Sequence, residues 1–149
     1  MSPNSVLVVD GRSEGRAALA RIVREAGHTA LVAGTAAEAL ALLSSLHPQL
    51  VLLDLDQLET SGIDLARQIK LESADVPLVL LSGSGDRDLV VKGMRTGAYD
   101  FLVKPVTSQA LRDVIKAAIV LTDSPALVAS HAGDGAGAGQ ATVGLDLLC

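Results

Sequence analysis

Four polar residues stand directly after apolar runs in this sequence: Asp10, Asp54, Ser82 and Lys104. If those runs are strands of one parallel sheet, the four side chains meet beyond the carboxyl ends of the strands, where open α/β sheets bind their ligands. Two carboxylates, a hydroxyl and an ammonium suit phosphoryl transfer to a carboxylate, in which an aspartate attacks phosphorus while a divalent cation and the other groups hold the oxygens. Each residue alone is explained at least as well as an ordinary turn or surface residue, so the prediction depends on all four together.

Asp54 is the predicted nucleophile among these residues. It follows the wholly apolar run LVLL at 50–53. Such a run predicts a buried, rigid strand, and a strand of this kind would fix the carboxylate at the rim of the sheet more firmly than a mobile loop.

Five apolar runs alternate with five helical patterns, which predicts an α/β fold: a five-stranded parallel sheet sandwiched by five helices, with right-handed crossovers. The predicted strands, each apolar on both faces, are Val6–Val9, Thr29–Ala33, Leu50–Leu53, Val76–Leu81 and Tyr99–Val103. The predicted helices are Ser13–Ala26, a segment from the capping box TAAE at 35–38 to about Leu46, Gly62–Leu71, Asp86–Thr96 and Thr107–Leu121. From residue 122 the sequence is rich in Gly, Ala and Ser, so we expect a domain at 1–121 and a flexible tail or linker at 122–149.

The composition narrows the class of protein. At 149 residues the chain has the length of one domain, and its net charge of −5 with scattered Lys and Arg argues against a nucleic-acid-binding surface. The single cysteine, Cys149, has no partner for an internal disulfide, and no apolar run reaches membrane-spanning length. We therefore expect a cytoplasmic protein that binds neither nucleic acid nor a membrane.

The chain resembles the receiver domain of response regulators, the phosphoacceptor half of two-component signalling. The resemblance covers about Val6 to Leu121 and is carried by four segments in the order and spacing of that family: VLVVD, PQLVLLDLDQLETSG, VPLVLLSGSGD and GAYDFLVKPV. It implies the flavodoxin-like topology of that family. It also implies that the protein catalyses its own phosphorylation and dephosphorylation on an aspartate rather than turning over a separate substrate.

The resemblance implies a role for each matching residue. Asp54 would accept a phosphoryl group from a histidine kinase or a phosphotransfer protein, and Lys104 matches the lysine of the family. Ser82 and Phe101 take the switch positions, where the hydroxyl moves to the phosphoryl group and the aromatic ring swings inward. The switched face, made by the fourth helix, the fifth strand and the last helix, would then bind a downstream protein or a second copy of the chain.

The resemblance also implies structural and metal-binding positions. The bond from Lys104 to Pro105 is expected to be cis, and Gly62 matches the glycine of the loop after the phosphorylated aspartate. Mg²⁺ would be held by Asp54 and the backbone carbonyl of Asp56, with Asp10 and the Asp56 side chain acting through water.

The sequence departs from the family at Gly11, where the family carries a second acid that binds Mg²⁺. Losing one charge about 4 Å from a cation costs on the order of a few kcal/mol at a protein-surface dielectric. This corresponds to roughly two or three decades of affinity, part of which extra water should recover. We therefore expect weak or absent Mg²⁺ binding and slow phosphorylation. Arg12 comes next, and its guanidinium is a candidate to pair with Asp10 or Asp54 in place of the cation, although a solvated Arg12 is the simpler interpretation.

Two other functions fit parts of the sequence. The same fold could serve as a pseudo-receiver, an interaction module that works without phosphorylation. Asp54-Leu-Asp56 also resembles the nucleophile motif of haloacid-dehalogenase-type phosphatases, but these need a further acidic pair on a later strand, and only isolated acids follow Lys104. The sequence leaves open the cognate kinase and pathway, the oligomeric state, the presence of an output domain and any role of the tail.

Overall fold

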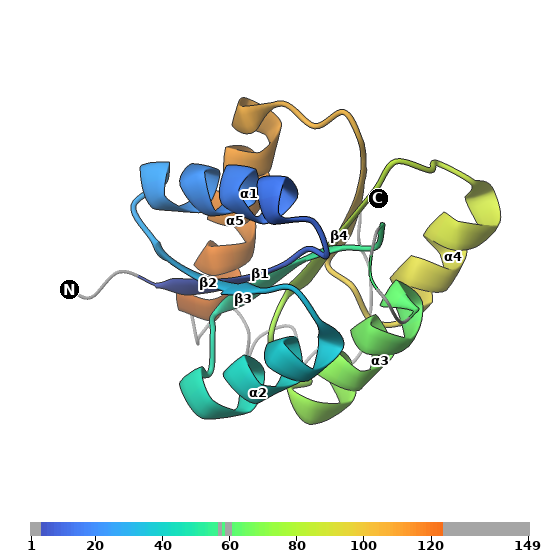
Figure 1. Cartoon of the computed structure of the whole chain (residues 1–149), viewed down its shortest axis with the longest axis horizontal. Helices are drawn as coiled ribbons and strands as arrows, with labels where there is room; N and C mark the ends of the chain where they lie inside the picture. Colours follow the sequence, from blue (N-terminus) through green and yellow to red (C-terminus); the bar gives the residue numbers. More distant parts are fainter. Residues whose placement is uncertain (1–3, 57, 59–60, 124–149) are drawn as a thin grey trace. The chain divides into compact units, whose positions relative to one another are not determined.

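The structure, a computed structural model, describes residues 4–56, 58 and 61–123 and is organised around a parallel sheet of five strands (Figure 1). The strands are β1 Ser5–Val9, β2 Thr29–Ala33, β3 Leu50–Asp54, β4 Leu78–Ser82 and β5 Asp100–Val103, in the spatial order β2-β1-β3-β4-β5. The chain leaves β1 for β2 on one side and continues with β3 on the other, so the strand order reverses between β1 and β3. Such a reversal is where open α/β sheets bind ligands.

Five helices cover the two faces of this sheet. They are α1 Ser13–Glu25, α2 Ala36–Leu46, α3 Gly62–Glu72, α4 Arg87–Arg95 and α5 Ser108–Asp123. α1 and α5 pack on one face, and α2, α3 and α4 pack on the other (Figure 1). The predicted α/β fold of flavodoxin-like topology is therefore confirmed.

Successive strand residues point to opposite faces of the sheet, which divides the core into two layers. Leu53 belongs to the layer under α2 and α3, whereas Leu52 belongs to the layer under α1 and α5. All residues of β3 and β4 are buried, as expected for strands that are apolar on both faces. The expectation fails at the edge strands β2 and β5, which have a neighbouring strand on one side only: Val32 and Val103 are each 45% exposed.

The helix ends follow the predicted signals. Thr35 Oγ1 accepts the N–H of Glu38 at 3.1 Å, as in the predicted capping box. The Glu38 carboxylate reaches back one residue further than the cap and accepts the N–H of Gly34 at 2.8 Å. Gly27 and Gly97 follow α1 and α4 with φ angles of 92° and 99°, a backbone conformation that favours glycine.

Two element boundaries differ from the prediction by two residues, and the others agree to within one. β4 starts at Leu78 rather than Val76, because Pro77 between them has no N–H to donate to a neighbouring strand. α5 runs to Asp123, past the predicted domain end at 121. The rest of the predicted tail at 122–149 lies outside the described residues, so the domain boundary stays a prediction. None of the helices in the described ranges combines the length and apolar character that a membrane crossing requires.

Candidate functional site

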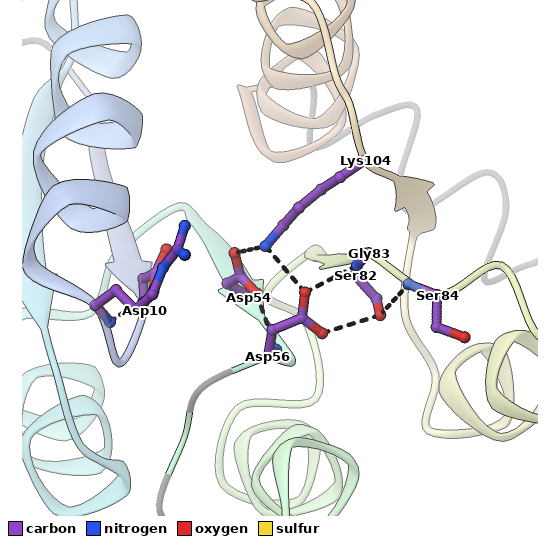
Figure 2. A network of polar contacts seen from close by, with 8 residues as sticks. Asp10, Asp54, Asp56, Ser82, Gly83, Ser84 and Lys104 are labelled. Carbon is purple, nitrogen blue, oxygen red and sulfur yellow. Dashed lines mark hydrogen bonds and ion pairs between the residues drawn. The ribbon is translucent and has the colours of Figure 1, made fainter.

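The register of the sheet brings the four predicted strand-end residues together (Figure 2). β1 and β3 end at the same level, so Asp10 and Asp54 emerge side by side, and Ser82 ends β4 beside the residue that precedes Lys104. Asp10, Asp54 and Ser82 are 2%, 3% and 0% exposed, respectively. The Lys104 ammonium lies 2.5 Å from Asp54 Oδ2. The side chains thus converge as the strand ends predict.

Asp54 is the last residue of β3, the central strand, and both of its carboxylate oxygens have partners. Oδ2 contacts the Lys104 ammonium, and Oδ1 accepts the N–H of Asp56 at 2.9 Å. The other residues of β3 are buried between the two core layers. A rigid strand therefore fixes the carboxylate, and the ammonium beside it can reduce the repulsion between this carboxylate and an approaching phosphoryl group.

The side chain of Asp56, in the loop after β3, is bound by three donors from the ends of β4 and β5 (Figure 2). Oδ1 accepts the Ser82 hydroxyl at 3.2 Å, and Oδ2 accepts the Gly83 N–H at 2.8 Å and the Lys104 ammonium at 3.1 Å. Burial pushes the pKa of the Asp56 carboxyl upward, but the three donors outweigh burial and lower this pKa below its ordinary value. We expected the Asp56 side chain to act through water, whereas the structure shows direct contacts with these three donors.

Lys104 follows β5 and is the cation of the site. Its N–H donates to the Ser82 carbonyl oxygen at 2.8 Å, and its bond to Pro105 is cis, as the resemblance predicts. Burial pushes the pKa of Lys104 downward, but the hydrogen bonds to Asp54 and Asp56 raise this pKa above its ordinary value. The ammonium therefore stays charged between the two carboxylates at neutral pH.

Asp10 lies on the β1 side of Asp54 and is held by the start of α1. Its Oδ1 accepts the Arg12 N–H at 2.8 Å, and its carboxylate packs against Gly15, where a Cβ would meet Oδ2 at 2.1 Å. Burial raises the pKa of the Asp10 carboxyl; the Arg12 N–H opposes this, and the charge of Asp54 raises the pKa further. The Arg12 side chain is exposed, and its guanidinium makes no ion pair with a carboxylate in the described part of the chain. Lys104, not Arg12, is the cation beside Asp54.

The acids in this arrangement leave few side-chain oxygens free for a Mg²⁺ ion. Within the ranges that the structure describes, no three His, Cys, Asp or Glu side chains converge as a metal-binding group. The side-chain oxygens of Asp56 accept three donors, those of Asp54 contact Lys104 and a backbone N–H, and Gly11 has no side-chain oxygen. Mg²⁺ needs a near-octahedral set of free oxygens. The charge of these carboxylates is balanced instead by the Lys104 ammonium.

The two predicted switch residues both point into the protein. The Ser82 hydroxyl faces the acids, and the Phe101 ring packs so closely on α4 that a Cβ at Gly93 would come within 2.9 Å of a ring carbon. Gly62 starts α3 against the loop after β3, where a Cβ would lie 3.0 Å from Leu55 Cα. Glycine at 62 and 93 therefore permits close approaches that a larger residue would prevent.

Three residues near the site were not identified from the sequence. Gly83 donates its N–H to Asp56, Gly15 packs against Asp10, and Arg16 Nη1 donates to the Asp10 carbonyl oxygen at 2.9 Å. The run SGSG at 82–85 was a usable signal for Gly83, because small residues after a strand leave backbone N–H groups accessible. The contacts of Gly15 and Arg16 depend on how α1 docks beside β1, which no local pattern encodes.

Comparison with known proteins identifies the family of this chain. The sequence model of the family described as response regulator receiver domain matches residues 6–116. The chain therefore belongs to the receiver domain family of response regulators. Membership of this family replaces the phosphatase interpretation of the Asp54-Leu-Asp56 motif.

Relatives of known identity are longer than this chain. It is 32% identical over 121 residues to the phosphate regulon transcriptional regulatory protein PhoB of Pseudomonas aeruginosa, which covers 80% of this chain and 53% of PhoB. It is 34% identical over 110 residues to the nitrogen assimilation regulatory protein NtrX of Azorhizobium caulinodans, across 72% of this chain and 24% of NtrX. The chain thus spans about half or less of the length of these relatives.

Solved structures show the same fold. The receiver domain of NtrX from Brucella abortus is 34% identical and superposes with a TM-score of 0.72, across 77% of this chain and 98% of that one. A CheY-like receiver domain protein from Methanospirillum hungatei JF-1 has a TM-score of 0.78 at 22% identity, across 83% of this chain and 98% of that one. The second likeness supports the fold alone.

Proposed function

We propose that this chain is the receiver module of a phosphorelay and accepts a phosphoryl group on Asp54. The observation that carries the proposal is the contact between the buried Asp54 carboxylate and the Lys104 ammonium at 2.5 Å, with Ser82 buried on the neighbouring strand. Receiver domains of response regulators interact with histidine kinases and with downstream effector domains. The donor is therefore the phosphohistidine of a kinase or of a phosphotransfer protein.

Phosphoryl transfer to Asp54 requires that the protein position the reacting groups and stabilise their charge, and it requires little further covalent chemistry. An oxygen of the Asp54 carboxylate bonds to phosphorus while the P–N bond of the phosphohistidine breaks, and the imidazole nitrogen keeps the electron pair of that bond. Lys104 can follow the negative charge from the carboxylate to the phosphoryl oxygens. The Ser82 hydroxyl and the Gly83 N–H are the further donors within reach of those oxygens.

Receiver domains typically bind Mg²⁺, and we propose that this chain binds it weakly. Gly11 supplies no carboxylate, and the oxygens of Asp54 and Asp56 are already engaged by Lys104 and by hydrogen-bond donors. When bound, Mg²⁺ would supply charge neutralisation at phosphoryl oxygens.

Apolar side chains on α4 and β5 support the predicted output face. Val91 and Met94 on α4 are exposed, as are Tyr99 directly before β5 and Val103 at its end. β5 is an edge strand, so no strand of the described residues pairs with its outer side. We propose that a downstream protein or a second copy of the chain binds here.

A second candidate function is an interaction module that works without phosphorylation. One observation favours it: the Lys104 ammonium contacts both Asp54 and Asp56, so a side chain of the protein already supplies positive charge beside these two carboxylates. In that case the same α4–β5 face would bind its partner without chemistry at Asp54.

Beryllofluoride, a phosphoryl mimic, separates the two candidates when it is titrated with Mg²⁺ and followed by two-dimensional NMR. The receiver proposal predicts shifts at Asp54, Ser82 and Phe101 in the native chain, and none in Asp54→Asn. If the signals shift in Gly11→Asp but not in the native chain, the native chain lacks only a ligand for the cation. Unchanged spectra in the native chain and in Gly11→Asp would favour the interaction module.

A further inference from the structure

Three hydrogen-bond donors at the ends of β4 and β5 converge on one carboxylate, that of Asp56 (Figure 2). The Gly83 N–H and the Lys104 ammonium reach Oδ2 at 2.8 and 3.1 Å, and the Ser82 hydroxyl reaches Oδ1 at 3.2 Å. A hydroxyl, a backbone N–H and an ammonium on separate strand ends form a small site for the oxygens of an anion. The anion that occupies it is a side chain of the protein itself.

A phosphoryl group on Asp54 would need the same donors. The Lys104 ammonium that contacts Asp56 also contacts Asp54, and the Asp56 N–H donates to Asp54 Oδ1 at 2.9 Å. The oxygens of a group attached to Asp54 would therefore lie beside this ammonium. Since those oxygens and the Asp56 carboxylate are both negative, the two anions repel each other and compete for one set of donors.

Asp56 also contacts Ser82, one of the two switch residues. It accepts the Ser82 hydroxyl, which in turn accepts the Ser84 N–H at 3.0 Å, so the hydroxyl is drawn toward the acids. The Phe101 ring is packed inward against Gly93 of α4. A hydroxyl turned to the acid site and an inward ring are the positions that the family resemblance associates with the phosphorylated state.

We infer that Asp56 is an internal competitor of the phosphoryl group: its carboxylate occupies the donors of Ser82, Gly83 and Lys104 before transfer and holds the switch residues in the engaged position. The inference rests on the proposed function of Asp54. Phosphorylation then requires the Asp56 side chain to swing away, and this side chain is 35% exposed, so solvent is open to it. The transfer of a phosphoryl group to Asp54 is therefore slowed. Ser82 and Phe101 already lie in their switched positions before the transfer.

The test compares the full chain with Asp56→Asn and Asp56→Ala. Phosphoramidate is the donor, because it carries the P–N bond of a phosphohistidine, and labelling is followed by the mass of the intact protein. A charge-assisted contact that must break before transfer is released in both variants, so labelling should be about tenfold faster than in the native chain. Asp64→Asn is the matched control, since it removes one carboxylate at the start of α3 whose ion-pair partner is the exposed Arg67; it should label at the native rate.

NMR spectra recorded before the donor is added test the second half of the inference. In Asp56→Ala the signals of Ser82 and Phe101 should move from their native positions, and labelling should return them. Equal labelling rates together with unmoved Ser82 and Phe101 signals would overturn the inference and leave the proposed function intact. No labelling in any variant would overturn the proposed function instead, and with it the inference that rests on that function.

Discussion

The acids on the two sides of Asp54 lie in opposite electrostatic environments. Asp10, on the β1 side, is almost fully buried, accepts a backbone N–H from Arg12, and has a raised pKa. Asp56, on the β4 side, is partly exposed, accepts three donors that include an ammonium, and has a lowered pKa. The difference teaches that, among the described residues, the positive charge beside Asp54 comes from the lysine side of the site, whereas the β1 side adds a second buried carboxylate.

Removing the Lys104 ammonium should have the largest effect on stability and on labelling, because it takes away the cation that distinguishes the Asp56 side of the site from the Asp10 side. Lys104→Met leaves Asp54 and Asp56 without a cation, which should cost about 1–3 kcal/mol of unfolding free energy, because Lys104 is partly solvated and its loss costs less than that of a fully buried partner. Removing a donor from the transferred oxygens should also slow phosphoramidate labelling roughly a hundredfold. Urea denaturation and labelling rates measure the two effects.

The exposed Lys92 of α4 offers the matched control for this variant. Lys92→Met should leave both measurements close to native. Native stability and native labelling in Lys104→Met would show that charge balance at Asp54 has another source.

Replacing Gly11 with the acid that the family carries should let the β1 side of the site bind a Mg²⁺ ion. Gly11 does not have a positive φ, so Asp fits its backbone conformation. Gly11→Asp should raise Mg²⁺ affinity by about a hundredfold, given one extra carboxylate near the cation and some loss of bound water. Calorimetric titration measures the affinity, and Gly11→Asn controls for size without charge. An affinity as low in Gly11→Asp as in Gly11→Asn would mean that Gly11 is not the cause of weak binding.

A substitution at Gly93 should move the Phe101 ring without changing the acidic site around Asp54. A Cβ there would meet the Phe101 ring at 2.9 Å and Leu80 at 2.9 Å, so Gly93→Ala should push the ring outward and cost about 1–2 kcal/mol from overpacking, after the better helix propensity of Ala is included. Labelling of Asp54 should continue, while the NMR signals of the ring change. Gly85→Ala is the control, because its Cβ would make ordinary contacts of 3.5 Å with Val103. An unmoved ring in Gly93→Ala would contradict the inward packing.

The smallest expected effects are opposite pH dependences for the two flanking acids. The folded pKa of Asp10 is raised, so this carboxyl stabilises the fold when protonated, and its contribution is lost as pH rises through the folded pKa. Asp10→Asn should therefore raise the free energy of unfolding at neutral pH, and the gain should shrink as pH falls through that pKa. The folded pKa of Asp56 is lowered, so its contribution is present above the unfolded pKa and lost at lower pH. Asp56→Asn should therefore lower the free energy of unfolding at neutral pH. Urea denaturation measures both variants, and changes of the same sign in Asp10→Asn and Asp56→Asn would contradict the opposite environments of the two acids.

The fold could be predicted because several local signals agree. The apolar runs, the capping box at Thr35 and the glycines after α1 and α4 each indicate the same element boundaries. The topology of a parallel sheet then places Asp54, Ser82 and Lys104 at one rim, which needs no knowledge of loop conformation.

The direction of side chains in the loops could not be predicted in the same way. Asp56 could have faced a metal ion or Lys104, and the choice depends on donors that lie far away in the sequence, such as Ser82 and Gly83. A glycine inside a helix, such as Gly15, costs about 1 kcal/mol relative to alanine. The reason for a glycine at this position is seen only in the structure, where the Asp10 carboxylate packs against it.

The account depends most directly on Asp54 as the acceptor. The decisive measurement is the mass of the intact chain after incubation with phosphoramidate, followed by peptide mapping of the acyl phosphate. We predict one added phosphoryl group located on Asp54, and none in Asp54→Asn. An unchanged mass of the native chain, or labelling that persists in Asp54→Asn, would contradict the account.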